Sequence, residues 1–80
     1  MLRVTDARYI SNHRIWLRFN DGVEGEVDLR DELQGEVFEP LKDPLCFRNF
    51  SLNPDLHTVT WPTGADFAPE FLHSLLRRNA

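Results

Sequence analysis

A β-hairpin within residues 14–29 constrains the fold of this chain more than any other feature. In residues 14–19, every second side chain is apolar (Ile15, Leu17 and Phe19), while Arg14, Trp16 and Arg18 point the other way; this is typical of a strand with one buried face. The next segment, Asn20-Asp21-Gly22, is typical of a tight turn that ends on a glycine in the left-handed region. We therefore expect two antiparallel strands joined by a short turn that contains Asp21 and Gly22.

The length of this turn determines which residues of the two strands face each other. A two-residue turn would set Phe19 opposite Glu24 and mix apolar with charged side chains on both faces. A three-residue turn keeps the apolar side chains together and sets opposite charges against each other on the other face. The predicted pairs are Phe19 with Val23, Leu17 with Gly25, Ile15 with Val27, Arg18 with Glu24, and Arg14 with Asp28.

Two more strand regions complete the predicted sheet. The first strand, within residues 2–10, needs a bulge near Thr5 and Asp6, because its apolar side chains change parity there. A second hairpin is expected around a four-residue turn at residues 53–56. This turn would pair Phe50 with Val59 and place His57 within the outgoing strand.

Between the hairpins, the sequence predicts brief helical turns. A turn over residues 31–35 would stop at Gly35, and prolines keep the turns within residues 36–43 and 44–47 short. The apolar side chains of this part are expected to fill the space under the sheet. They are Val37, Phe38, Leu41, Leu45 and Phe47.

A corner between a strand and a helix is predicted over residues 60–70. Trp61 is expected to pack in the core, and Pro62 with Gly64 would break the strand. Asp66 would either cap nearby amides or hold the preceding loop. Pro69 suits the first position of a helix, and the apolar stripe of that helix would lie on the sheet: Phe71, Leu72, Leu75 and Leu76.

These elements predict the α+β class: a small curled antiparallel sheet built from two hairpins, with short helical turns and one C-terminal helix packed on it. The 80 residues are expected to form a single domain, 1–80, with limited room for a deep pocket. A single cysteine, Cys46, rules out a disulfide framework, and its apolar neighbours favour burial. The sequence shows neither a signal peptide nor a membrane span, so we expect a cytoplasmic protein.

Composition and spacing argue against most kinds of chemistry. The net charge is −4 and the basic residues are scattered among acids, so we do not expect direct nucleic-acid binding. His13, His57 and His73 lack metal-ligand spacing and are expected at the surface or at edges. The acidic run over residues 24–39 is explained by a solvated strand face and loop. We therefore expect no enzymatic activity, no metal and no cofactor.

One face of the first hairpin is a candidate interaction surface. Trp16 falls on the charged outer face in the predicted register, where it would either mark an interface or be covered by another layer, such as the segment around Phe38 or the last helix. The neighbouring carboxylates would suit a basic partner protein. The candidate surface consists of Trp16, Arg18, Glu24, Glu26 and Asp28.

A second set of residues forms an architectural motif, and its order along the chain resembles a known family. The motif residues are Asp21, Gly22, Trp61, Pro62, Gly64, Asp66 and Pro69. Together with Gly25-Glu26-Val27-Asp28-Leu29, Val37-Phe38-Glu39-Pro40-Leu41-Lys42-Asp43-Pro44, Phe47, Val59-Thr60, Ala65, Glu70 and Leu72, they resemble the bacterial domain-of-unknown-function family 2442 over nearly the whole chain. Departures are modest: Thr63 stands where Asn is common, and Ala68 stands where a better helix cap often precedes the proline.

The resemblance implies a small α+β domain with a curled antiparallel sheet and no established activity or catalytic residue. It also implies that some relatives are one half of a toxin–antitoxin-type gene pair, and that others carry a helix-turn-helix. Our leading hypothesis is a protein-interaction or regulatory module whose partner is another small protein or a second copy. The alternative is a DNA-associated transcriptional regulator acting as a dimer or through a partner, and an enzyme using Asp28, Asp66 or a histidine ranks last.

Overall fold

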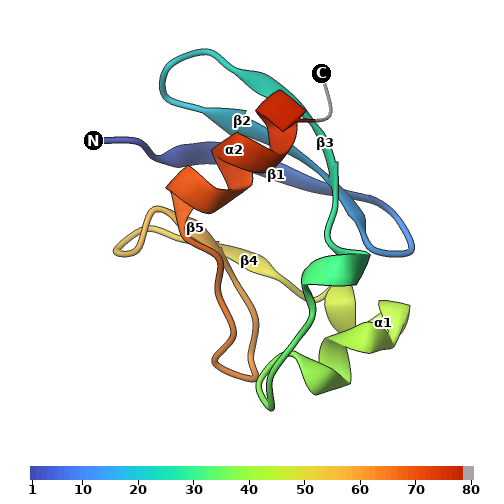
Figure 1. Ribbon diagram of the computed structural model, residues 1–80. Coiled ribbons are helices and arrows are strands. Elements are labelled where there is room, and N and C mark those ends of the chain that lie inside the picture. Colours follow the sequence, from blue (N-terminus) through green and yellow to red (C-terminus); the bar gives the residue numbers. More distant parts are fainter. Residues whose placement is uncertain (79–80) are drawn as a thin grey trace.

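Figure 1 shows a computed structural model, which describes residues 1–78, as two small β-sheets joined by short helical turns and covered in part by one helix. In chain order the elements are β1 (Val4–Ser11), β2 (Arg14–Phe19), β3 (Glu24–Asp28), the 3-10 turns η1 (Arg30–Glu32) and η2 (Glu39–Lys42), α1 (Pro44–Phe47), β4 (Ser51–Asn53), β5 (Thr58–Thr60) and α2 (Pro69–Arg78). The predicted α+β class is confirmed. The strands are divided between a three-stranded sheet in the order β1-β2-β3 and a two-stranded sheet, β4-β5.

The first hairpin has the predicted register. Arg14 faces Asp28, Leu17 faces Gly25 and Arg18 faces Glu24 across β2 and β3. The backbone amide of Phe19 donates to the carbonyl of Val23 over 2.8 Å, which leaves the three predicted turn residues between them. Gly22 has a φ of +88°, a backbone conformation that glycine adopts without strain.

The predicted bulge in β1 is also present. The pairing of β1 with β2 shifts register between Val4 and Asp6. As a result, Val4 is buried in the core, and Ala7, which is opposite Leu17, points to the same side of the sheet. A second shift lies between Tyr9 and Ser11, close to the turn that leads into β2. The bulge between Val4 and Asp6 adds an unpaired residue to β1, so that the apolar side chains before and after it point to the same face of the sheet.

The predicted register of the second hairpin is wrong. Leu52, and not Phe50, faces Val59. The cause lies in the turn, because His57 adopts a φ of +57° and therefore belongs to the turn and not to β5. The side-chain oxygen of Asn53 accepts the amides of Asp55 and Leu56, and the amide of His57 donates to the backbone carbonyl of Asn53 over 2.8 Å. The turn thus occupies residues 54–57.

The short helical turns lie where the sequence predicts them, but three of their side chains are more exposed than expected. Val37 is 43% exposed and Leu45 is 64% exposed, and Cys46 is also exposed. The prediction that these residues are buried is wrong. Val37 lies in the loop between η1 and η2, whereas Leu45 and Cys46 are exposed because α1 is a single turn of four residues and presents only one side to the core. Phe47 occupies that side and is fully buried.

Helix α2 covers the inner face of the three-stranded sheet (Figure 1). Pro69 begins this helix, and Leu72, Leu75 and Leu76 of the predicted stripe are buried against the sheet residues, while Phe71 is partly buried. The packing is closest at Gly25, where an added Cβ would lie 2.9 Å from Cδ2 of Leu76. Among residues 1–78, no helix has the length and apolar character needed to cross a bilayer.

The corner before α2 is held by Trp61, which is buried as predicted. Its indole Nε1 donates to the carbonyl of Phe47 over 2.6 Å, and its backbone amide donates to the carbonyl of Ala65. Gly64 takes a φ of +93° in the turn between them. Asp66 pairs through its backbone with Thr60. The hydrogen bonds found within residues 1–78 do not include its carboxylate, so Asp66 holds this corner through its main chain.

Candidate functional site

The side of the three-stranded sheet that faces away from α2 carries the predicted interaction residues. We call it the outer face, and it consists of Asp6, Arg8, Arg14, Trp16, Arg18, Glu24, Glu26 and Asp28. The charged members of this set are exposed, and Trp16 is half-buried. The structure therefore brings the five candidate residues of the sequence analysis onto one face. It also adds Asp6, Arg8 and Arg14 to them.

Trp16 lies at the centre of the outer face between two arginines. The guanidinium carbon of Arg8 is 5.1 Å from the centroid of the indole ring, and that of Arg18 is 5.3 Å from it. The layer considered in the sequence analysis is elsewhere, since Phe38 packs on Phe67 and α2 lies on the opposite side of the sheet. The cover of Trp16 thus comes from cation–π contacts with Arg8, its partner on β1, and with Arg18, two residues further along β2.

Arg18 is held in place by carboxylates on both neighbouring strands. Its Nε donates to Oε2 of Glu24 over 2.7 Å, and its Nη1 lies 3.6 Å from Oδ2 of Asp6. The hydrogen bond to Glu24, followed by the negative charge of that carboxylate, raises the pKa of Arg18 above its ordinary value. These contacts keep the guanidinium beside the indole ring of Trp16.

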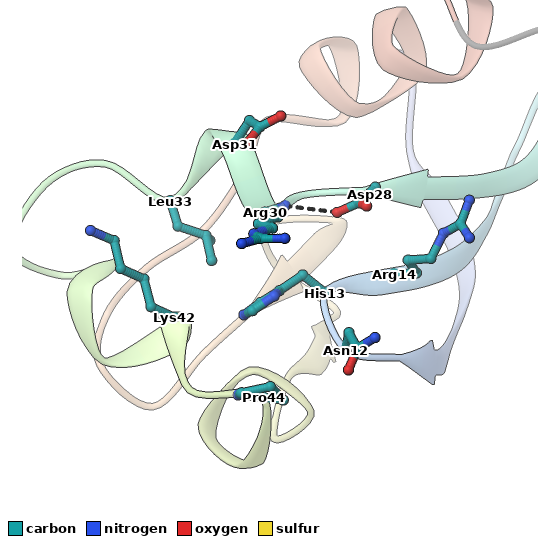
Figure 2. A pocket seen from close by; sticks show the side chains of 9 residues that line it. All are labelled: Asn12, His13, Arg14, Asp28, Arg30, Asp31, Leu33, Lys42 and Pro44. Atoms are coloured by element: carbon teal, nitrogen blue, oxygen red, sulfur yellow. Dashed lines mark hydrogen bonds between the residues drawn. The ribbon is translucent and has the colours of Figure 1, made fainter.

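A second feature, which the sequence analysis did not foresee, is a hollow of about 700 Å³ at one end of the outer face. Figure 2 shows how side chains from the turn before β2, the end of β3, η1, η2 and the start of α1 surround it. The lining residues are Asn12, His13, Arg14, Asp28, Arg30, Asp31, Leu33, Lys42 and Pro44. Since these elements are far apart in the sequence, only the folded chain brings them together.

His13 is a buried lining residue and not the surface histidine that the sequence predicts. It is 9% exposed, and its Nε2 lies 2.9 Å from the carbonyl oxygen of Leu41 in η2. A carbonyl only accepts hydrogen bonds, so Nε2 carries the proton in this contact. The ring also packs edge-on against Phe47 at a centroid distance of 5.0 Å. This residue therefore ties the β1–β2 turn to η2 and α1.

Three cationic side chains reach the hollow from separate elements: Arg14, Arg30 and Lys42. Lys42 pairs with Glu39 over 3.1 Å, whereas the ion pairs found within residues 1–78 do not include Arg14 or Arg30. Oδ1 of Asp28 accepts the backbone amide of Arg30 over 3.0 Å, which fixes the start of η1 (Figure 2). The part of the chain that the structure describes holds no group of three metal-ligating side chains.

The motif residue Asp21 links the first hairpin to the covering helix. Its Oδ1 accepts the amide of Val23, and its Oδ2 lies 2.9 Å from Nε2 of His73. The backbone amide of Val23, with a further contribution from His73, lowers the pKa of Asp21 below its ordinary value. The ring of His73 also packs edge-on against Phe19 at 5.0 Å. The remaining motif residues lie in this turn, at the corner after β5 and at the start of α2.

Sequence reasoning missed Arg8, His13, Arg14 and Arg30 as members of these two surfaces. A signal for Arg8 was present, because the predicted bulge in β1 puts its side chain on the same face as Trp16. His13 and Arg30 gave no such signal, since their place in the hollow depends on how η1 and η2 pack against the hairpin.

Comparison with known families gives one result. The model of the family described as "Protein of unknown function (DUF2442)" matches residues 4–77. Searches among curated proteins and among solved structures found no match. The match spans both sheets and nearly all of α2, as the residue order of the motif implies. The chain therefore belongs to the DUF2442 family, whose members share an uncharacterised domain.

Proposed function

We propose that this domain is a protein-interaction module that acts by binding and not by catalysis, and that the outer face is its contact surface. One observation carries the proposal: Trp16 lies half-exposed between Arg8 and Arg18 on the side of the sheet opposite α2. Tryptophan and arginine are enriched among the residues that dominate binding energy at protein interfaces.

One side chain beside Trp16, that of Arg18, is held in place before a partner arrives. Arg18 is fixed by Glu24 and Asp6, and both strands that flank β2 contribute to this arrangement. Ordering a long side chain on binding costs about 0.5–1.5 kcal/mol, so a pre-ordered arginine removes part of that loss. The outer face therefore offers a rigid aromatic centre with a charged rim.

The charges suggest what kind of partner would fit. The outward residues of β3 are all acidic, namely Glu24, Glu26 and Asp28, so a basic patch would complement this edge. We propose another small protein as the partner. A neutralising or regulatory role in a toxin–antitoxin-type gene pair fits this arrangement, with the product of the adjacent gene as the basic protein.

The outer face does not favour the alternative of a DNA-associated regulator. Its eight residues include four acids, Asp6, Glu24, Glu26 and Asp28, against three arginines. A long phosphate backbone is bound by arginine and lysine side chains that cluster in excess over acids. We therefore leave DNA binding out of the proposal.

The test is co-expression of the domain with the product of its neighbouring gene, followed by size-exclusion chromatography and titration calorimetry. We expect a stable complex whose Kd rises at least about tenfold in the Trp16→Ala variant, as for a residue at the centre of an interface. Leu56→Ala is the matched control, because Leu56 is also exposed and hydrophobic but lies in the turn before β5. It should leave the Kd unchanged.

Separate elution of the two proteins at micromolar concentration would contradict the gene-pair role. Equal affinity of the Trp16→Ala variant and the parent domain would contradict the outer face as the contact surface. If the domain alone forms a dimer that Trp16→Ala dissociates, the partner is a second copy and not another protein.

A further inference from the structure

The hollow differs in construction from the outer face, with which it shares Arg14 and Asp28, and the proposal made for it does not rest on the proposed partner. Cationic side chains from three elements reach it: Arg14 from β2, Arg30 from η1 and Lys42 from η2. Within residues 1–78, the ion pairs leave Arg14 and Arg30 without a carboxylate partner. On the outer face, by contrast, the charge of Arg18 is balanced by two carboxylates.

The size and lining of the hollow indicate a small polar ligand. Its volume of about 700 Å³ falls within the range of small-molecule sites, about 300–1,000 Å³. Only Leu33 and Pro44 contribute apolar side chains to the lining, and the lining contains no Phe, Tyr or Trp ring on which a nucleobase could stack. These features favour a compact, hydrophilic molecule over a nucleotide or a lipid.

The frame around the hollow is held by hydrogen bonds that do not depend on a ligand. His13 contacts the carbonyl of Leu41, and its own carbonyl accepts the amide of Leu29 over 2.9 Å. Asp28 accepts the backbone amide of Arg30, as the dashed line in Figure 2 shows. The backbone positions of the two unpaired arginines are therefore fixed by β2 and by the start of η1, which limits the loss of freedom on binding.

We propose that the hollow binds a small oxyanion, a carboxylate or phosphate group, through the guanidinium group of Arg30, which lies beside His13, while Arg14 adds positive charge at the rim (Figure 2). A guanidinium presents parallel N–H donors that match the two oxygens of such a group. Lys42 adds positive charge at the η2 side. Asp28 and Asp31, which also line the hollow, oppose the anion and limit its affinity.

The experiment is an NMR titration of the ¹⁵N-labelled domain with citrate and, separately, with inorganic phosphate, against sodium chloride of equal ionic strength. We expect saturable shifts of the amide signals of Asn12, His13 and Arg14 and of the Arg30 signals. Saturation by citrate alone identifies a carboxylate site, and saturation by phosphate alone identifies a phosphate site. Shifts that match those in chloride, or that centre elsewhere on the molecule, overturn the proposal.

Variants of both charge signs separate binding from a structural role. Arg30→Gln should weaken binding about tenfold, as expected for loss of a charge-assisted hydrogen bond, and Arg14→Gln should weaken it less, because only a charge at the rim is lost. Arg3→Gln is the matched control, because Arg3 is exposed and adjoins Asn20 at the other end of the hairpin. Asp28→Asn retains a side-chain oxygen for the amide of Arg30 and should strengthen binding a few-fold.

Each of these outcomes bears on the site. If Arg3→Gln and Arg30→Gln weaken binding equally, the effect comes from the overall charge of the domain, and the site is overturned. Weaker binding by the Asp28→Asn variant would also overturn it. If Arg30→Gln does not fold, Arg30→Lys keeps the charge but loses the paired donors, and it should still bind less tightly than the parent domain.

Discussion

The two faces of the three-stranded sheet share the same strands and differ in nearly everything else. On the inner face, Ile15, Leu17, Phe19 and Val27 are each at most 1% exposed beneath α2. On the outer face, the alternate residues of β2 and β3 are charged or, like Trp16, half-buried. Because side chains point to opposite sides at every step along a strand, one hairpin supplies both surfaces.

The inner face contributes most of the stability of the fold, whereas the side chains of the outer face remain accessible. Removal of the inner side chains from water contributes the larger share of folding energy, since apolar burial is the main favourable term. The outer contacts are between partly exposed groups, such as Arg18 and Glu24, whose side chains are both 48% exposed. Exposed ion pairs contribute little stability, so substitutions there leave the fold intact.

The largest expected difference between the faces is at two neighbouring residues of β2. Leu17→Ala empties a fully buried position and should lower the free energy of unfolding by about 3 kcal/mol. Trp16→Ala removes a larger side chain from the outer face and should cost less than half of that. Urea unfolding followed by circular dichroism measures both. Equal losses of unfolding free energy would show that Trp16 contributes as much to stability as a core residue.

A smaller difference is expected at two neighbouring residues of β3. Gly25→Val places a side chain against Leu76 of α2 and should destabilise the domain by about 2 kcal/mol, because the helix must shift. Glu26→Val, one residue later on the outer face, should change stability by less than about 0.5 kcal/mol. Thermal unfolding of both variants provides the measurement. Recovery of stability in the Gly25→Val, Leu76→Ala double variant would identify the steric contact as the cause.

The smallest expected effect concerns pH and the contact between the hairpin turn and α2. The pKa of Asp21 is lowered in the folded state, chiefly by the amide of Val23 and also by His73. Its carboxylate therefore stabilises the fold above the unfolded pKa, about 3.9, and this contribution is lost as the pH falls through the lower folded pKa. Between about pH 5 and pH 2, the parent domain should lose more stability than the Asp21→Asn variant does.

The measurement is urea unfolding at several pH values. Asp55→Asn is the matched control, because Asp55 is an exposed aspartate in the turn after β4 whose carboxylate is not among the hydrogen bonds and ion pairs found within residues 1–78. It should follow the parent domain. A parallel pH dependence of the parent and Asp21→Asn domains would mean that the carboxylate contributes nothing to folding.

The two hairpins show how far local sequence reasoning reaches. In the first, the alternation of residues 14–19 and a glycine in the turn fix the register, since any other pairing mixes the faces. In the second, the strands are only three residues long and the turn ends on His57 in the left-handed region. Few side chains there show which face is buried. Histidine is more common at positive φ than most residue types, but it adopts such a φ too rarely for the residue type alone to predict it.

The two candidate surfaces also differ in how far the sequence predicts them. The five residues of the predicted interaction surface share a face because the register of one hairpin places them there. The hollow depends on the packing of η1, η2 and α1 against the end of that hairpin. The burial of His13 and the exposure of Cys46 have the same origin, since each depends on which side of a short helical turn faces the core.

The sequence alone determined the first hairpin, its bulged neighbour strand, the position of α2 in the chain and five of the outer-face residues. These features follow from alternation, turn chemistry and helical spacing, which act over a few residues. The tertiary structure alone decided the register of β4 and β5, the burial of His13 and the hollow with its two unpaired arginines. Such features arise from contacts between segments that are distant in the chain, and a pattern of neighbouring residues does not predict such contacts.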